Sequence, residues 1–285
     1  MDLSVAQKLW LLRVRVASLV LPRRSAQWAE EIFLTPQRVQ RPDSERLWFE
    51  NARKRTLSGG IASYEWGQEA GPLVLLVHGW SGRGTQLGAF AEVLVKRGYR
   101  VVAIDGPAHG SSQGEQTNVG QFSNCLVQVQ KELGPLEAVV AHSFGAGCSV
   151  LAVIKGMQAK KLVLVAGPAH YDKVIQDFLG MLKMTEKAER FFYESLEKKV
   201  GLKASDMNVG AMGHEVLKDQ LRVLVVHDRD DKEVPFSSAM AIQTAWPEVE
   251  VYETMGLGHR RILKNPEVAQ KVAQFISDKS SEALQ

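Results

Sequence analysis

The sequence predicts an α/β protein with a mostly parallel central sheet and helices on both of its faces. Unbroken apolar runs, typical of strands that are buried on both sides, alternate with stretches in which apolar residues recur at helical spacing. The alternation continues from about residue 73 to about residue 277. Such an order of elements favours crossover connections, and therefore a parallel sheet between two layers of helices.

Size and composition place the chain among ordinary globular proteins. With 285 residues, 45% of them hydrophobic and 24% charged, it can form one large domain with an insertion, which we favour over two small domains. Cys125 and Cys148 are too few for a disulfide framework, so we expect a reduced, cytoplasmic setting. No run reaches the ~18 consecutive apolar residues that a membrane-spanning helix requires.

Residues 1–50 are interpreted as a basic, helical N-terminal arm. Residues 1–55 hold eleven Lys and Arg against six Asp and Glu, a net charge of +5, and the rest of the chain carries about −2. Because the body of the protein is not basic, no nucleic-acid partner is expected. Residues 22–50, interrupted by Pro36 and Pro42, contain four large aromatic residues that we expect to clamp the arm to the body: Trp28, Phe33, Trp48 and Phe49.

Residues 3–21 predict a helix that is closed by Pro22. Its apolar residues are interrupted by Lys8, Arg13 and Arg15, which suits a basic helix in peripheral contact with an anionic membrane through residues 3–24. A secretory signal fits less well, because arginines stand inside the run and no small-residue cleavage site follows. We favour a helix packed on the domain or on a second subunit, and the oligomeric state is left open.

The core domain is predicted over residues 51–167 and 218–285. It begins with an antiparallel hairpin at residues 53–66, which turns at Ser58-Gly59-Gly60. Gly98 and Gly134-Pro135 end the first two helices of the α/β part. The later strands are predicted at 73–77, 100–104, 138–142, 161–165, 221–226 and 248–253, and the helices between and after them at 86–97, 117–133 and 262–277.

Residues 168–217 interrupt this rhythm and are interpreted as an inserted helical cap. Two helices are predicted there, at 171–184 and 186–200, with Thr185 as an N-cap. The segment is far longer than a single connection needs. It is rich in methionine and aromatic residues, which suit an adaptable apolar pocket or simply pack the insertion on the body: Met181, Met184, Met207, Met212, Tyr171, Phe178, Phe191, Phe192 and Tyr193.

One serine stands between a predicted strand and a predicted helix. The segment Ala141-His142-Ser143-Phe144-Gly145 has the small residues that a sharp strand-to-helix turn requires. By itself, a serine there also suits a helix N-cap. The segment resembles the nucleophile elbow of the α/β-hydrolase family, G-x-S-x-G, with Ala141 in place of the first glycine. The resemblance, which covers roughly residues 52–278, implies the α/β-hydrolase fold with a helical cap and a nucleophilic role for Ser143.

Two further segments resemble loops of the same family. His78-Gly79-Trp80 follows the first apolar strand and resembles the His-Gly-x loop, which implies an oxyanion hole made by the backbone N–H groups of Trp80 and Phe144. The segment from Asp105 to Ser112 resembles D-x-x-G-H-G-x-S, with Ala108 in place of its glycine. There we expect Asp105 and His109 to satisfy backbone groups.

The remaining triad members are predicted from the end of the sequence. Asp228, Asp230 and Asp231 all follow the strand at 221–226, and physical reasoning alone does not choose among them. The family places its acid three residues before a Val-Pro pair, which selects Asp231. His259, which follows Gly256 and Gly258, could be carried on a loop to the serine as a general base with a near-neutral pKa. The order Ser143, Asp231, His259 is that of α/β-hydrolases.

The sequence thus predicts a serine esterase that acts on a small-molecule ester with an apolar acyl or alcohol part. No cofactor is needed, and the histidines show no metal-ligand spacing. Thioesterase, amidase, C–C hydrolase and acyltransferase activities remain open, because each begins with the same triad. An alternative from another class is a non-catalytic receptor on the same fold, and the sequence does not disclose the substrate.

Overall fold

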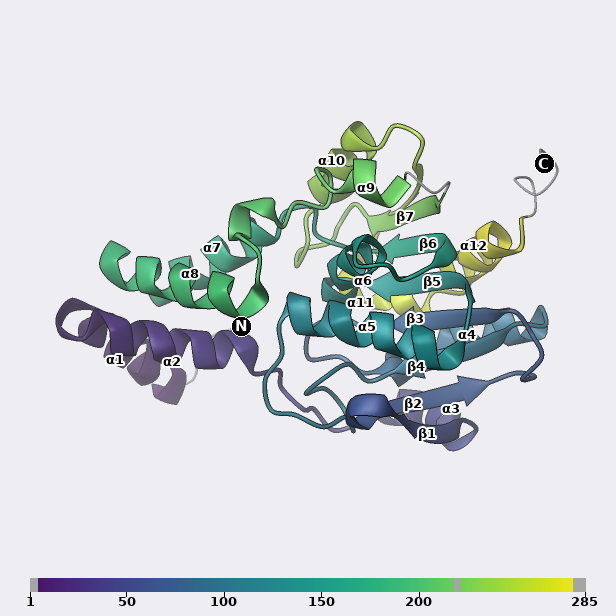
Figure 1. Ribbon diagram of the computed structural model, residues 1–285, viewed down its shortest axis with the longest axis horizontal. Coiled ribbons are helices and arrows are strands. Elements are labelled where there is room, and N and C mark those ends of the chain that lie inside the picture. Colours follow the sequence, from purple (N-terminus) through teal and green to yellow (C-terminus); the bar gives the residue numbers. More distant parts are fainter. Residues whose placement is uncertain (1–4, 218–220, 279–285) are drawn as a thin grey trace.

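The computed structural model describes residues 5–217 and 221–278, and an eight-stranded sheet forms the centre of its α/β part (Figure 1). Its strand order is β1-β2-β4-β3-β5-β6-β7-β8. The pairs β1–β2 and β2–β4 are antiparallel, and all the others are parallel. The strands are β1 Arg53–Leu57, β2 Ile61–Trp66, β3 Leu73–Val77, β4 Arg100–Ile104, β5 Leu136–His142, β6 Ala159–Val165, β7 Arg222–Asp228 and β8 Glu250–Thr254.

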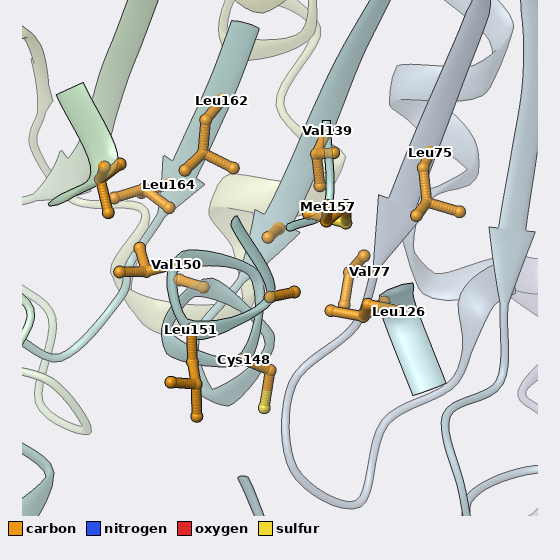
Figure 2. Packing of buried hydrophobic residues seen from close by; sticks show 14 of the residues in the cluster. Leu75, Val77, Leu126, Val139, Cys148, Val150, Leu151, Met157, Leu162 and Leu164 are labelled. Carbon is orange, nitrogen blue, oxygen red and sulfur yellow. The ribbon is translucent and has the colours of Figure 1, made fainter. Parts of the chain in front are cut away.

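Both faces of the parallel strands are apolar because each face is covered by helices. Leu75 and Val77 point to the face covered by α5 (Val119–Leu133) and α6 (Phe144–Ile154), as Figure 2 shows. Val74 and Leu76 point to the opposite face, which is covered by α4 (Gly88–Lys96) and α12 (Pro266–Ser277). The unbroken apolar runs therefore form strands of a sheet that helices cover on both faces, as predicted.

The α/β-hydrolase fold expected from the sequence is present, and the differences concern the final helix and the N-terminal arm. The final helix, expected at 262–277 with an adjustment around Pro266, consists of a 3-10 turn at Ile262–Lys264 and α12, and the short helix α11 (Gly258–Arg261) precedes it. The division falls at Asn265, whose side chain accepts from the N–H of Val268 and caps α12, and Pro266 occupies the first helical position. Proline is favoured there because the first helical N–H has no partner in the helix.

The N-terminal arm folds into two helices rather than one. α1 spans Val5–Val20, and α2 spans Pro22–Leu34. Pro22, which we expected only to close the first helix, also begins the second. Leu3 and Ser4 of the predicted helix lie outside the described residues, as do residues 218–220 and 279–285 and the side chains of Lys8 and His214. No helix in the described ranges is long and apolar enough to cross a bilayer.

α1 and α2 pack against α7 (Tyr171–Leu182) and α8 (Glu186–Val200), and we call these four helices the helical lobe (Figure 1). The lobe has its own apolar interior, in which Phe192 is fully buried and Phe33 contacts both Phe178 and Phe192. Thr185 caps α8 as predicted, and its hydroxyl also donates to the carbonyl of Ser18 in α1. The arm and residues 168–217 therefore form one packing unit. The rest of the insertion contains a 3-10 turn and α9 (Gly213–Leu217).

Between the lobe and the sheet, the arm crosses the body of the domain. α3 (Arg46–Glu50) brings Trp48 and Phe49 against β2, where the Trp66 indole N–H donates to the Trp48 carbonyl at 3.0 Å. The Phe49 ring lies 5.7 Å from the ring of Tyr64. The arm is thus held to the sheet by aromatic contacts at residues 48–49 and to the insertion by residues of α1 and α2.

Candidate active site

Ser143 stands on a strained turn between β5 and α6. Its φ of 52° and ψ of −119° are rare for a residue with a side chain, and such strain persists only where the surroundings hold it. The N–H of Ser143 donates to the carbonyl of Val165 on β6 at 2.9 Å. A Cβ at Gly145 would lie 2.4 Å from the carbonyl oxygen of His78, so the turn requires glycine at that position. Ala141, in contrast, is accommodated within β5.

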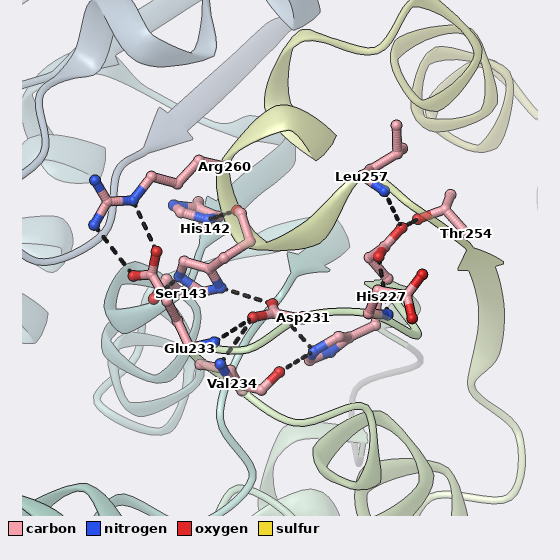
Figure 3. Close-up of polar contacts among 12 residues, drawn as sticks. His142, Ser143, His227, Asp231, Glu233, Val234, Thr254, Leu257 and Arg260 are labelled. Atoms are coloured by element: carbon pink, nitrogen blue, oxygen red, sulfur yellow. Dashed lines mark hydrogen bonds and ion pairs between the residues drawn. The ribbon is translucent and has the colours of Figure 1, made fainter. Parts of the chain in front are cut away.

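His259 reaches the serine from the short helix α11. Its Nε2 lies 2.9 Å from Ser143 Oγ, and its Nδ1 lies 2.7 Å from Asp231 Oδ2 (Figure 3). The side chains of Asp231 and His259 are almost fully buried. Three residues that are far apart in the sequence are thereby joined in one chain of hydrogen bonds, in the order acid, imidazole, hydroxyl. A carboxylate on Nδ1 leaves the lone pair of Nε2 directed at the hydroxyl.

The three neighbouring aspartates have different partners. Asp231 faces His259, whereas Asp228 accepts from Thr254 Oγ1 and from the N–H groups of Asp230 and Leu257. Asp230 accepts from the N–H of Gly256. Asp228 and Asp230 therefore hold the loop that leads to His259, and of the three only Asp231 contacts the imidazole.

Asp231 is held in its ionised form by its surroundings. Burial acts to raise the pKa of Asp231, but hydrogen bonds from His227, His259 and the backbone N–H of Val234 together lower it well below the usual value. Its Oδ1 accepts from the N–H groups of Glu233 and Val234, at 2.8 and 2.9 Å. A buried carboxylate with this many donors stays charged at neutral pH and can stabilise a neighbouring imidazolium.

The backbone beside Ser143 offers two donors. Among the hydrogen bonds of the described residues, none uses the N–H of Trp80 or of Phe144. A Cβ at Gly79 would lie 3.0 Å from Cβ of Ser143, so the loop that carries Trp80 passes close to the serine. Phe144 begins α6, whose N-terminus carries a partial positive charge. The Trp80 and Phe144 rings are packed edge to face, with centroids 5.1 Å apart.

Two buried histidines support these segments in their neutral forms. His78 accepts the N–H of Gly106 on Nε2 at 2.8 Å, so its Nδ1–H donates to the carbonyl of Gly79. Burial lowers the pKa of His78 to about 4. His142 contacts the His259 ring, with centroids 4.7 Å apart, and its Nε2–H donates to the His259 carbonyl at 3.0 Å. Burial and the neighbouring His259 lower the pKa of His142 to about 3.

The loop after β4 serves the architecture, as expected for Asp105 and His109. The Asp105 carboxylate accepts from the N–H groups of Gly84 and Ser111 and from the Tyr64 hydroxyl. His109 donates from Nδ1 to the carbonyl of Pro107 at 2.9 Å, and burial lowers the pKa of His109 to about 3. The described hydrogen bonds of these two side chains therefore go to loop residues and to Tyr64, not to Ser143 or His259.

Two residues at the site were missed by sequence reasoning. The Tyr171 hydroxyl, at the start of α7, donates to the Phe144 carbonyl and accepts from the Gly147 N–H, each at 2.9 Å. His227, at the end of β7, donates from Nε2 to the Val234 carbonyl at 2.9 Å and lies 3.5 Å from Asp231 Oδ2. No sequence motif marks Tyr171, whereas His227 could have been suspected from its place beside the acidic cluster.

The methionine and aromatic residues of the insertion are placed mainly in packing roles. Met184 and Phe192 lie inside the helical lobe, Met207 and Tyr171 belong to the main core, and Met181 is exposed. Within residues 5–217 and 221–278, no group of three His, Cys, Asp or Glu side chains has the arrangement of a metal site.

The three residues of the candidate site lie within the part of the chain that matches a known protein family. A sequence profile of the alpha/beta hydrolase family matches residues 74–271, which include Ser143, Asp231 and His259. A serine hydrolase-like protein of Dictyostelium discoideum is 26% identical over 129 residues, 43% of this chain and 33% of that protein. A lysophosphatidylserine lipase of Danio rerio is 23% identical over 232 residues, 73% of this chain and 59% of that protein. The chain therefore spans less than two thirds of the length of either relative.

Solved structures agree on the fold. An esterase of Pyrococcus furiosus superposes with a TM-score of 0.63 at 22% identity, covering 85% of this chain and 98% of that chain. The thioesterase domain from the curacin biosynthetic pathway superposes with a TM-score of 0.59 at 18% identity, covering 79% of this chain and 98% of that chain. At such identities the likeness concerns the fold alone.

Proposed function

The chain belongs to the alpha/beta hydrolase family, and we propose that it is a serine hydrolase that cleaves a carboxylic ester through an acyl-enzyme intermediate. The observation that supports this proposal is the chain of hydrogen bonds from Asp231 through His259 to Ser143 Oγ. A serine hydroxyl is a weak nucleophile unless a base receives its proton, and this arrangement supplies the base and the group that orients it.

In the first half of the reaction, Ser143 Oγ attacks the ester carbonyl while His259 Nε2 takes the hydroxyl proton. The N–H groups of Trp80 and Phe144 donate to the oxyanion of the tetrahedral intermediate, since neither has another described partner. The imidazolium, stabilised by the charged Asp231, then protonates the leaving alcohol as the C–O bond breaks. Ser143 is left as an acyl ester.

In the second half, His259 takes a proton from water, and the resulting hydroxide adds to the acyl carbonyl. Collapse of this intermediate returns the proton to Ser143 Oγ and releases the carboxylic acid. Every bond and proton is balanced by the ester, water and the three side chains, so the steps use no cofactor. The partly exposed rings of Trp80 and Phe144, the two residues whose N–H groups would form the oxyanion hole, lie 5.1 Å apart, which supports an ester with an apolar part.

The test is hydrolysis of p-nitrophenyl esters from acetate to laurate by the wild-type protein and the Ser143→Ala variant. We expect turnover by the wild type, labelling of Ser143 by a fluorophosphonate probe, and a loss of about 10⁴-fold or more in kcat/KM in the variant. The matching thioesters and anilides, run beside the esters, rank the alternative activities. A wild-type protein that neither turns over these substrates nor reacts with the probe would refute the proposal and favour a non-catalytic receptor.

A further inference from the structure

The helix α1 carries apolar residues on the face that points away from the other three helices of the helical lobe. Val14, Ala17 and Ser18 are buried against the neighbouring helices. The opposite face is exposed, and its five large apolar residues show between 54% and 74% of their surface: Leu9, Leu12, Val16, Leu19 and Val20. A helix that is apolar on both faces is typical of one that is covered on both. We call these five residues the outer stripe.

Arginines stand at both edges of the outer stripe. At 3.6 residues per turn, the exposed residues follow one another around the helix in the order Arg15, Leu19, Leu12, Val16, Leu9, Val20, Arg13. Arg23 and Arg24 continue the positive charge at the start of α2, and both are exposed. From residue 3 to residue 29 the sequence contains five basic residues and no Asp or Glu.

We propose that the outer stripe of α1 binds the surface of a membrane that contains anionic lipid. An apolar strip with cations on both sides suits a helix that lies in the interface, with its apolar side chains among the acyl chains and its arginines at the phosphate level. The Arg13 guanidinium, 5.0 Å from the centre of the Trp28 ring, is positioned at one edge by this contact.

A second copy of the chain is a poorer partner for this face. If the outer stripes of two copies packed against each other, Arg13 and Arg15 of both copies would lie at the same interface. α1 has no described acidic side chain to pair with these arginines. Like charges at such positions oppose association. An anionic bilayer offers both the apolar medium and the negative charge that the stripe lacks. The proposal does not rest on hydrolytic activity.

The experiment is flotation of the full chain, carrying Ser143→Ala so that no lipid is hydrolysed, with two kinds of vesicle. One kind is phosphatidylcholine alone, and the other contains 30% phosphatidylserine, roughly the regime of an anionic leaflet. We expect binding to the anionic vesicles that weakens as salt is raised. The triple change Leu12→Gln, Val16→Gln and Leu19→Gln should weaken it more than tenfold, whereas Met255→Gln, an equally exposed apolar residue outside the lobe, should not.

The charges are tested by a matched pair of variants. Arg13→Gln with Arg15→Gln should weaken binding about 25-fold, from about fivefold for each cation near an anionic surface. Arg13→Lys with Arg15→Lys keeps both charges and should bind like the parent. Two results would overturn the proposal: vesicle binding that is absent or is unchanged by the triple change, or a dimer by light scattering that the triple change abolishes. All the variants alter exposed side chains, and their thermal unfolding is compared with the parent to establish that each is folded.

Discussion

Asp231 and Asp228 are both buried and lie three residues apart, yet different donors face them. Asp231 bonds to the imidazole of His259, and Asp228 bonds to Thr254 and to backbone N–H groups of the loop. We expect Asp231→Asn to lower kcat of ester hydrolysis by about 10⁴-fold, because an amide does not hold His259 in the required tautomer or stabilise its charged form. The measurement is kcat at neutral pH, with KM expected to change little.

Asp228→Asn is the matched control for that change. It places an amide N–H₂ against a donor in a buried site, which should cost about 1–3 kcal/mol in the free energy of unfolding. We expect kcat to stay within tenfold of the wild type. Equal losses of kcat in both variants, or a larger loss in Asp228→Asn, would contradict the assignment of Asp231 as the residue that orients His259.

Tyr171 is expected to act as a positioning residue for the nucleophile turn. Its hydroxyl joins the Phe144 carbonyl to the Gly147 N–H, so Tyr171→Phe leaves both groups with one partner fewer inside the protein. We expect kcat to fall roughly tenfold with KM unchanged. Full loss of an oxyanion-hole donor lowers kcat by about 10²–10³-fold, and a misplaced turn would weaken that contact only in part. Tyr193→Phe, at a half-buried tyrosine of α8, serves as control. If both variants lose thermal stability but keep kcat, Tyr171 is only structural.

At the level of single residues, the sequence could predict a site residue where a motif surrounded it. Ser143 and His259 were predicted from the resemblance to the nucleophile elbow, the neighbouring small residues and the order of the triad along the chain, and the structure brings them together at 2.9 Å. The choice of Asp231 needed the family pattern, because three carboxylates follow the same strand and only the path of the loop decides which one turns inward. Tyr171 could not be predicted, since its role depends on how the insertion packs on α6.

The segment between α2 and α3 is tied to the loop after β4 by one arginine. The Arg38 guanidinium donates to the carbonyls of Ala108, Gly110, Ser112 and Gly114, at 2.7 to 3.2 Å. This loop needs support, because Ala108 has a φ of 64° at the position where the family pattern has glycine. One side chain thus binds four carbonyls of the loop that contains this strained residue.

We expect Arg38→Lys to lower the free energy of unfolding by about 1–2 kcal/mol, because an ammonium group cannot reach four carbonyls at once. Amides of residues 108–114 should then exchange with solvent faster than in the wild type, as measured by hydrogen exchange. Arg46→Lys is the control, since the described partner of Arg46 is the exposed carboxylate of Asp43, three residues away. Similar exchange rates in the wild type and in Arg38→Lys would show that the arm does not hold this loop.

At the level of elements, strands were predicted more closely than helices. The strand at 100–104 has the predicted bounds, because an apolar run buried on both faces ends where the polar loops begin. α2 was missed because Pro22 was interpreted only as the end of a helix, although proline also suits the first position of one. The pairing of the arm with the insertion was not predictable, since it depends on contacts between segments far apart in the sequence, such as Ser18 with Thr185, which are 167 residues apart.

For the molecule as a whole, the buried histidines predict how stability depends on pH. His78, His109 and His142 have pKa values lowered to about 4, 3 and 3, in each case chiefly by burial. In the unfolded chain a histidine titrates near ~6.5. Below that pH the unfolded state binds protons that the native state does not bind, so stability is complete above about pH 6.5 and falls as the pH is lowered toward 4.

Each histidine contributes a slope of about 1.4 kcal/mol per pH unit, and the three together contribute about 4 kcal/mol per unit between pH 6 and 4.5. Carboxylates whose pKa is lowered, such as Asp231 and Glu65, add their loss only at lower pH, below their unfolded values. Urea unfolding at pH 8.0, 6.0, 5.25 and 4.5 measures the slope. His109→Asn can keep the bond to the Pro107 carbonyl while removing one titrating group, so it should reduce the slope by about a third. A wild-type stability that is flat from pH 8.0 to 4.5 would mean that these imidazoles take up protons in the folded protein, and the neutral supports inferred for His78 and His142 would then be wrong.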